Sequence, residues 1–293
     1  MRVTVGLPFL NAQQTLSDAI RSVFAQTFHD WELILVDDGS TDASLEIARS
    51  IRDPRVKVLS DGANLGLPAR LNQVAALAQG EFLARMDADD LMHPDRLARQ
   101  IECLDSDEQP DLVGTGVYVV DAAANPIGIR DLEPIDTRPE AALAQPILPH
   151  PTVTGRTRWF RENPYDESFP RAEDYELWLR TCAESKFAKI TEPLHYFREG
   201  VRQPGKYLVE YIRTARSVRK VLRLHSPLAV GRPRVLRLLA SSYLKEFTYR
   251  LATPAGVQRR LMQMRYGRPL SGAELEAALD GLKTIAAAEV GQP

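Results

Sequence analysis

The sequence predicts an α/β fold: a doubly wound, mostly parallel sheet with helices on both faces over residues 1–200, then a basic helical C-terminal region over residues 201–293. Short apolar runs alternate with segments of helical periodicity, and turn-forming or acidic residues follow the apolar runs. Charge also divides the chain. Residues 200–293 contain 17 Lys and Arg against 6 Asp and Glu, whereas the residues before them contain 20 against 33. Such asymmetry predicts two regions with different roles.

The composition is that of an ordinary globular protein, because 44% of the 293 residues are hydrophobic and 26% are charged. The two cysteines, Cys103 and Cys182, lie far apart and match no metal-binding spacing, so we expect reduced thiols. No apolar run reaches the roughly 18 residues that span a bilayer, and the chain enters a predicted strand at once, so no secretory signal is expected. We expect a cytoplasmic location, extending to peripheral contact with the inner face of the membrane, and no nucleic acid partner.

The first third of the chain alternates strand and helix. Strands are predicted at Val3–Leu7, Glu32–Val36, Val56–Leu59 and Glu81–Ala84. Helical segments follow them, around Leu16–Phe24, from Ser40 or Thr41, around Leu71–Ala78 and over Pro94–Leu104. Ligands bind such sheets beyond the carboxyl ends of the strands. We therefore expect Pro8–Asn11, Asp37-Asp38 and Asp87–Asp90 to meet at one crevice.

The remainder is less regular. We predict a strand at Asp111–Val120, a hairpin near Asn125–Gly128, a short helix around Pro139–Gln145, a strand at Val153–Phe160 and a helix at Glu173–Glu184. Amphipathic helices are expected at Lys206–Leu224 and Val235–Leu251. Ser271 and Glu274 form a capping box that predicts a last helix over Ala273–Ala288.

Three carboxylates, those of Asp87, Asp89 and Asp90, separate a predicted strand from a predicted helix. Two carboxylates about 4 Å apart repel by roughly 4 kcal/mol at an effective dielectric constant of about 20, so a cation is expected beside them. Helix capping explains them poorly, because Pro94 is the expected first helical residue and His93 the expected N-cap. An EF-hand loop also fits poorly, since its Gly and its late Glu are missing. The stretch favours Mg²⁺ or Mn²⁺, held by one or two carboxylates and completed by substrate phosphates.

Four motifs occur in a characteristic order: Val-Asp-Asp-Gly-Ser-Thr-Asp at 36–42, Asn-Leu-Gly at 64–66, Asp-Ala-Asp-Asp at 87–90 with a following Pro94, and Ala-Glu-Asp-Tyr-Glu-Leu-Trp-Leu-Arg at 172–180. With them, roughly residues 1–199 resemble the family 2 glycosyltransferases of the GT-A fold. The resemblance implies an inverting transfer of a sugar from a nucleotide diphosphate sugar, with a UDP-sugar as the expected donor. The acceptor would be a hydroxyl group, on a lipid-linked saccharide or another cell-surface glycan precursor.

The resemblance also implies a nucleotide site. Asp38 matches the acid that accepts a hydrogen bond from the nucleobase. The alternative is a purely structural role, in which Asp38 stabilises a turn. Pro8 and the loop after it match the segment under the base. Leu10 stands where many members have Tyr, so aromatic stacking is lost or comes from Phe9. Arg70 falls in the loop and helix near the nucleotide, and a solvated helix residue is an equal alternative.

The catalytic roles follow from the same resemblance. Asp87 matches the carboxylate that contacts the ribose, and Asp89 matches the ligand of Mn²⁺ or Mg²⁺, with Asp90 supporting it from behind. Asp174 matches the general base, which would take the proton of the acceptor alcohol. Glu173 is expected to orient Asp174. The alternative for both is a helix first turn that attracts acids through its dipole.

Two further segments are compared with the family. His150-Pro151 corresponds to an acceptor-side pair, or to a structural histidine. Tyr196–Glu199 departs from the Tyr-Arg-x-His pattern at the end of the domain, so a further metal or diphosphate ligand from this segment is in doubt.

Other classes of protein fit less well. A nucleotidyltransferase would carry a Gly-rich, basic phosphate loop after the first strand, and Pro8–Asn11 is not one. A phosphatase with an Asp nucleophile would have its Asp-x-Asp on the first strand. A non-catalytic nucleotide-sugar-binding module remains as an alternative, although every acidic motif is intact.

Two interpretations stay open for the basic helix at 206–224. Its apolar face pairs with the rest of the protein in one, and its cations bind anionic lipid in the other, at roughly 1 kcal/mol per basic residue. The apolar face consists of Leu208, Tyr211, Ile212, Ala215, Val218 and Leu222, and the cations are Lys206, Arg213, Arg216, Arg219, Lys220 and Arg223.

Overall fold

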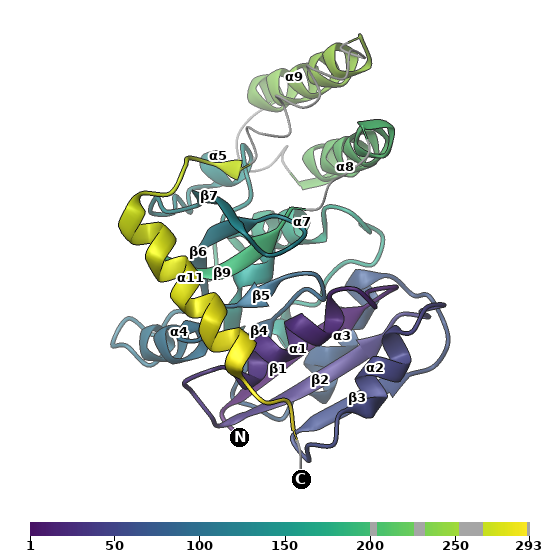
Figure 1. The fold of residues 1–293 in the computed structure, drawn as a ribbon. Coiled ribbons are helices and arrows are strands. Elements are labelled where there is room, and N and C mark those ends of the chain that lie inside the picture. The colour runs from purple at the N-terminus through teal and green to yellow at the C-terminus, as the bar shows by residue number, and fades with distance from the viewer. Residues whose placement is uncertain (200–203, 226–231, 252–265, 292–293) are drawn as a thin grey trace.

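The computed structural model describes residues 1–199, 204–225, 232–251 and 266–291. A nine-stranded sheet runs through the molecule in the order β3-β2-β1-β4-β8-β6-β9-β5, with β7 paired to β6. Helices lie on both sides of this sheet, and two long helices stack beyond its far end (Figure 1). The fold is therefore the predicted α/β class.

The first four strands are parallel, as their apolar runs predict. They are β1 (Val3–Phe9), β2 (Trp31–Asp37), β3 (Val56–Ser60) and β4 (Phe82–Arg85). Strands β1 and β2 are buried along their whole length, which is typical of strands covered on both faces. The register places Phe9 beside Asp37 and Gly6 beside Arg85. The motifs that follow β1, β2 and β4 therefore leave the sheet at the same edge.

Beyond β4 the sheet is mixed. The remaining strands are β5 (Leu91–Met92), β6 (Leu112–Val120), β7 (Pro126–Arg130), β8 (Thr154–Arg156) and β9 (Phe187–Arg198). Strand β8 is antiparallel to both β4 and β6, whereas β9 is parallel to β6. Strand β5 pairs antiparallel with β9. The predicted hairpin is confirmed as β6 and β7, while the sequence pattern predicts neither β5 nor β9.

The two faces of the sheet carry separate cores. Helices α1 (Leu16–Phe24), α2 (Ser44–Ser50) and α4 (Arg96–Leu104) cover one face, and α3 (Leu67–Leu77), α6 (Thr157–Glu162) and α7 (Glu173–Thr181) cover the other. Alternate residues of β2 point to opposite cores, with Leu33 and Leu35 in the first and Ile34 and Val36 in the second. Two short helices, α5 (Pro139–Ala142) and η1 (His150–Thr152), precede β8.

Two predicted helix starts are wrong by a few residues. Helix α4 begins at Arg96 rather than at Pro94. The carbonyl of His93 accepts a hydrogen bond from Gln26 Nε2 (2.8 Å) and that of Pro94 from Thr27 N (2.9 Å), so this turn is held by the loop after α1. Helix α2 begins at Ser44, because the Asp42 carboxylate accepts hydrogen bonds from Gln13 N and Ser44 N and holds the preceding residues against the loop after β1.

The predicted strand at 153–160 is also wrong beyond Arg156, where the chain turns into α6. Arg161 donates hydrogen bonds to the carbonyls of Ala75 (2.9 Å) and Ala78 (2.6 Å) at the end of α3. Trp159 and Phe160 are buried in the core below α3. Contacts from a distant helix thus override the local strand pattern.

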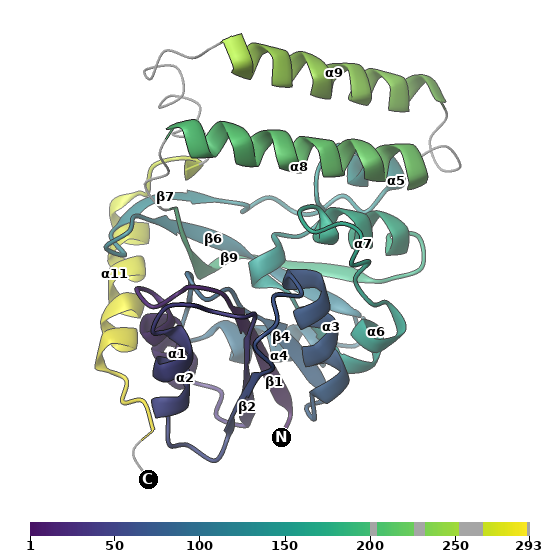
Figure 2. The ribbon, with the colours of Figure 1, turned by 90° about the vertical axis from the view of Figure 1, so that its right-hand side faces the viewer.

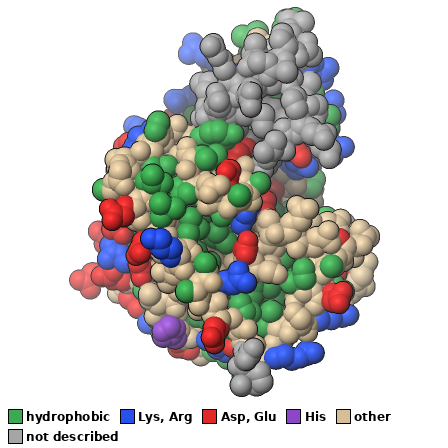
Figure 3. Space-filling view, viewed as in Figure 1, with side chains coloured by type: hydrophobic (Ala, Val, Ile, Leu, Met, Phe, Trp, Pro, Cys, Tyr) green, Lys and Arg blue, Asp and Glu red, His purple; other side chains and the backbone are tan. Residues whose placement is uncertain are grey.

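Helices α8 (Pro204–His225) and α9 (Arg232–Leu251) lie side by side beyond the sheet, with α8 on the inner side (Figure 2). Packing is confirmed for the apolar face of α8, because Ala215 and Leu222 are buried and Val218 contacts the core that contains α7. The side chains of Lys206 and Leu208 lie outside the described part of the chain. Lys and Arg side chains are visible at the margins of this region in Figure 3. In the segments that the structure describes, no helix is long and apolar enough to cross a membrane.

The last helix, α11 (Gly272–Ala287), returns to the sheet and packs against α1. Its predicted capping box is confirmed: Glu274 N donates to Ser271 Oγ, and Ser271 N donates to the Glu274 carboxylate. Tyr196 Oη donates to the carbonyl of Ala278 (2.9 Å). The helix can approach this closely because residue 281 is glycine, and a Cβ at this position would collide with the Tyr196 hydroxyl. The expected division near residue 200 stays a prediction.

Candidate active site

The two acids that end β2 have different partners. Asp37 closes a turn, since its carboxylate accepts hydrogen bonds from Ser40 N (2.9 Å) and Ser60 Oγ (2.8 Å). Asp38 accepts from Leu65 N (2.8 Å) and from Gly66 N, so it holds the loop that precedes α3. Gly66 has a φ of 88°, a conformation that glycine adopts without strain. This geometry explains why a glycine ends the Asn-Leu-Gly motif.

Arg70 is buried rather than solvated, so the solvated alternative is wrong. Its side chain is 1% exposed and forms ion pairs with Asp38 (2.9 Å) and Asp61 (2.7 Å). It also donates to the carbonyl of Ala63 (2.6 Å). The Arg70 guanidinium lowers the pKa of the Asp61 carboxyl well below its usual range. Arg70 therefore ties the loop over residues 61–66 to the end of β2.

The residues expected beneath the nucleobase lie at the end of β1. Pro8 and Phe9 are buried, and Phe9, 2% exposed, belongs to the core that contains α1. The exposed side chain is that of Leu10, at 43%. In this conformation an aliphatic surface, and no phenyl ring from Phe9, faces solvent after β1.

The three acids after β4 form a cluster in which ligand oxygens of Asp87, Asp89 and Asp90 lie within 4.8 Å of one another. Both oxygens of Asp87 are engaged by Arg85, at 2.6 and 2.7 Å. Both oxygens of Asp90 are engaged as well, by His195 Nε2 and by Arg198 N, each at 2.8 Å. Asp89 is exposed, and its carboxylate makes no hydrogen bond to another described residue. It is therefore the one carboxylate of the cluster with no partner among the described residues.

The surrounding protein, and next the charges of Asp90 and Asp87, raise the pKa of the Asp89 carboxyl to about 7. The protein thus leaves negative charge here that a cation would neutralise. Carboxylate oxygens suit Mg²⁺ and Mn²⁺, which bind through one or two carboxylates and complete their shell with water and phosphate. The residues present fit such an ion, and Asp89 offers the carboxylate that is free to bind it.

A buried hydrogen-bond network contacts Asp90 from the interior of the protein. Arg96 and His195 are fully buried, and Arg96 Nη1 lies 3.0 Å from His195 Nδ1. Because arginine can only donate, Nδ1 must accept, and the ring proton is on Nε2, where it is donated to Asp90. Burial, and next the Arg96 charge, lower the pKa of His195 well below its usual value, which agrees with a neutral ring. The sequence pattern missed this network, because His195 lies on the unpredicted strand β9.

Arg85 is a second residue of the candidate site that the sequence pattern did not indicate. It is 4% exposed, and its Nε has no hydrogen-bond partner among the described residues. Besides its ion pair with Asp87, its charge acts on Glu173 and Asp174, where it lowers both carboxyl pKa values against the effect of burial. Arg85 therefore lies between the acidic cluster after β4 and the acids of α7. The only hint in the sequence is an arginine at the end of an otherwise apolar run.

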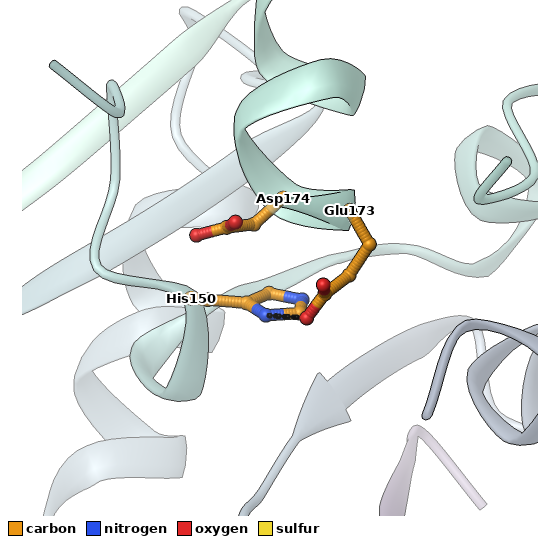
Figure 4. Close-up of side chains that lie close together, drawn as sticks. All are labelled: His150, Glu173 and Asp174. Carbon is orange, nitrogen blue, oxygen red and sulfur yellow. Dashed lines mark ion pairs between the residues drawn. The ribbon is translucent and has the colours of Figure 1, made fainter. Parts of the chain in front are cut away.

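The two acids that begin α7 diverge, as Figure 4 shows. Glu173 turns to His150, with Oε1 3.7 Å from Nδ1, while Nε2 of His150 lies 2.9 Å from the hydroxyl of Tyr165. Burial, and next the charge of Asp174, raise the pKa of Glu173 to about 7. Burial also raises the pKa of Asp174. The ligand atoms of His150, Glu173 and Asp174 lie within 4.8 Å of one another.

Asp174 faces a cavity of about 640 Å³, and Glu173 does not line it. His150, the loop at 130–136 and the loop at 145–151 form much of its wall, with Lys189 and Phe197 from β9. A carboxylate with a raised pKa at the wall of a cavity can accept a proton from a bound hydroxyl group. This arrangement favours Asp174 over Glu173 as a base.

Comparison with known proteins shows the family of this chain. The family model "Glycosyl transferase family 2" matches residues 4–169. EpsE of Bacillus subtilis (strain 168), provisionally named a glycosyltransferase, is 33% identical over 207 residues, which cover 68% of this chain and 73% of EpsE. WcaA of Escherichia coli (strain K12), provisionally named a colanic acid biosynthesis glycosyl transferase, is 27% identical over 204 residues, or 66% of this chain and 72% of WcaA. The chain belongs to glycosyltransferase family 2, and the predicted resemblance is confirmed.

Solved structures share the fold. TarS of S. aureus, in complex with UDP, aligns with 97% of this chain and 89% of its own at a TM-score of 0.62 and 18% identity. The mannosyltransferase PcManGT of Pyrobaculum calidifontis, in complex with GDP-Man and Mn²⁺, aligns with 96% of this chain and 87% of its own at a TM-score of 0.60 and 19% identity. These likenesses confirm the predicted GT-A fold.

Proposed function

We propose that this glycosyltransferase moves a sugar from a nucleotide diphosphate sugar to a hydroxyl acceptor, in a single displacement that inverts the anomeric centre. A UDP-sugar is the proposed donor, and the complex of TarS with UDP-GlcNAc supports it. The acceptor is a precursor of a cell-surface polysaccharide, lipid-linked saccharides included, which the colanic acid assignment of WcaA supports. The protein acts in the cytoplasm at the inner face of the membrane. Its free thiols, Cys103 and Cys182, support a reducing compartment.

The position of Asp174 carries this proposal. A single displacement needs one base that faces the attacking hydroxyl group, and Asp174 is the carboxylate that lines the cavity beside His150. Glu173 points toward His150 instead, with Oε1 3.7 Å from Nδ1, and we assign it the orientation of the start of α7. The acceptor hydroxyl would lie in the cavity and lose its proton to Asp174 as its oxygen attacks the anomeric carbon.

The proposed donor site is the shared edge of β1, β2 and β4. Asp38 contacts the nucleobase above Pro8, while Arg70 holds the neighbouring loop in place. Asp87, kept in one orientation by Arg85, contacts the ribose. Asp89 would hold Mn²⁺ or Mg²⁺, an ion that neutralises the charge of a leaving diphosphate. The complex of PcManGT with GDP-Man and Mn²⁺ supports the use of such an ion by proteins of this fold.

The test compares Asp174→Asn with Glu173→Gln. If Asp174 is the base, donor turnover falls by roughly 10²–10⁴-fold while nucleotide affinity is retained, because the donor contacts lie elsewhere. If it only favours the helix N-terminus, stability falls by about 1 kcal/mol or less and turnover is unchanged. A larger loss of turnover in Glu173→Gln would assign the base to Glu173. NMR of the product linkage gives a separate check, since retention of configuration contradicts a single displacement.

A thermal-shift screen of nucleotides separates the alternatives. Stabilisation by a nucleoside diphosphate that requires Mn²⁺, together with release of that diphosphate from a nucleotide sugar, supports a glycosyltransferase. Release of inorganic diphosphate from a nucleoside triphosphate would indicate a nucleotidyltransferase. Binding without turnover of any nucleotide sugar, to acceptor or to water, would indicate a non-catalytic module.

A further inference from the structure

The outward face of α9 carries a stripe of apolar side chains. Leu236, Leu244 and Phe247 are 64%, 63% and 59% exposed. Together with the exposed Ala240 they recur at helical spacing, so they lie on one side of the helix. Tyr243 borders this face but is engaged by α8, because Arg223 donates to its hydroxyl (2.7 Å) and the Arg219 guanidinium lies 4.3 Å from its ring centroid. Single exposed hydrophobic residues need no explanation, but a contiguous stripe of large ones marks an interaction surface.

The stripe cannot turn inward, because the opposite side of α9 is fastened to α8. Arg219 of α8 is 4% exposed and donates hydrogen bonds to Glu246 (2.7 Å) and to Ser242 Oγ (3.2 Å). Val235 is buried on the same side, and Leu238 packs against the core that contains α7. The inner face of α9 is therefore committed to the protein.

Cations flank the stripe. Arg237 is exposed next to it, and Arg234 and Lys245 are exposed farther round the helix on the same side. Arg250 lies on the other side, where it is paired with Glu246. The only acid of α9 is Glu246, which is buried and paired with Arg219 and Arg250. The outward surface of α9 thus combines an apolar stripe with positive charge alone. This is the pattern of helices that lie in the plane of a membrane interface.

We propose that α9, through the stripe of Leu236, Ala240, Leu244 and Phe247 and its cations, docks this enzyme on the surface of an anionic lipid bilayer. The stripe enters the boundary between headgroups and acyl chains, and the cations contact the headgroup phosphates. The basic face of α8, for which the sequence left packing and membrane contact as open alternatives, is secondary. Its Lys220 is occupied by Ser168 and by the ring of Phe169.

The docked orientation has a consequence for the acceptor, and this consequence alone depends on the proposed function. Arg234, at the start of α9, donates to the carbonyl of Glu140 in α5 (3.3 Å). The chain runs from α5 directly into residues 145–151, which line the cavity of Asp174. A bilayer on α9 would therefore lie near the loop that forms the acceptor cavity, which favours a lipid-linked acceptor.

The experiment is co-sedimentation of the full-length protein with phosphatidylcholine vesicles and with mixed phosphatidylcholine–phosphatidylglycerol vesicles, at low and high salt. We expect binding to the mixed vesicles at low salt, weakened at high salt. Each of Leu236→Ser, Leu244→Ser and Phe247→Ser should weaken it by about one power of ten, because one large apolar side chain no longer leaves water. Arg237→Gln with Lys245→Gln should weaken binding only to the mixed vesicles.

The matched control is Leu77→Ser with Leu279→Ser, two leucines that are 46% and 40% exposed on α3 and α11. These changes should leave vesicle binding unaltered. Failure of the wild type to bind mixed vesicles at low salt overturns the proposal, as does equal binding by the stripe variants. A wild-type dimer that the stripe variants convert to monomers, without vesicle binding, would assign the stripe to a second copy of the chain instead. Donor hydrolysis in solution is measured in parallel and should be equal in all variants, so its absence would refute the proposed function and leave the vesicle result standing.

Discussion

Asp89 and Asp90 are chemically identical neighbours, yet the structure predicts opposite consequences for their replacement by alanine. Asp90 is 1% exposed and accepts hydrogen bonds from His195 Nε2 and Arg198 N. Asp90→Ala leaves both donors unpaired, and each unpaired donor lowers the free energy of unfolding by about 1–3 kcal/mol. Part of this loss is offset because the variant no longer buries the charge of Asp90. We expect a loss of about 3 kcal/mol in the free energy of unfolding, or roughly 6–12 °C in Tm.

Asp89→Ala should instead cost about 0.5 kcal/mol or less, because an exposed carboxylate without a partner is removed. It should abolish the Mn²⁺-dependent part of nucleoside diphosphate binding. Asp90→Ala, acting through the position of its neighbour, should weaken that binding by only about tenfold.

Thermal unfolding, and calorimetric titration of UDP and GDP with and without Mn²⁺, measure both effects. Asp90→Asn is the matched control, since it keeps the size of the side chain and one acceptor oxygen and should lose less stability than Asp90→Ala. The reasoning fails if Asp90→Ala melts at the wild-type temperature, or if Asp89→Ala retains its full dependence on Mn²⁺.

Three further outcomes are expected. Arg70→Lys should lower the free energy of unfolding by about 3–5 kcal/mol and weaken UDP binding, because lysine cannot replace the bidentate guanidinium group in the buried ion pairs. Unchanged denaturant unfolding together with unchanged UDP titration would contradict this. Arg85→Met should move the acid limb of the pH profile of kcat/KM to higher pH, because the charge of Arg85 lowers the pKa of Asp174 and a base must be deprotonated to act. An acid limb that stays in place or moves to lower pH would show that Arg85 does not control the pKa of the base. Gly281→Ala should cost about 1–3 kcal/mol, because its Cβ would strike the Tyr196 hydroxyl beneath α11, and an unaltered melting temperature would show that α11 simply shifts outward.

Much of the fold could be predicted because its signals are local. Continuous apolar runs define β1 to β4, and their parallel pairing follows from the helices between them. The capping box of Ser271 and Glu274 lies within four residues and places the last helix to within one residue. The strands β5 and β9 were not predicted, because their pairing joins Leu91 to Tyr196, which lie more than a hundred residues apart in the sequence. No local pattern carries that information.

The sequence by itself determined which residues gather at the edge of the sheet and which family the motifs resemble, because motif order and strand order are written along the chain. Only the tertiary structure decided what each acid does there. The Asp90 carboxylate is hydrogen-bonded by His195 of β9, whereas that of Asp89 is left exposed to solvent. Asp174 faces the cavity and Glu173 does not, because successive residues of a helix point in directions about 100° apart. Residue type sets the chemistry that a side chain can perform, and its neighbours in space set whether that chemistry is available.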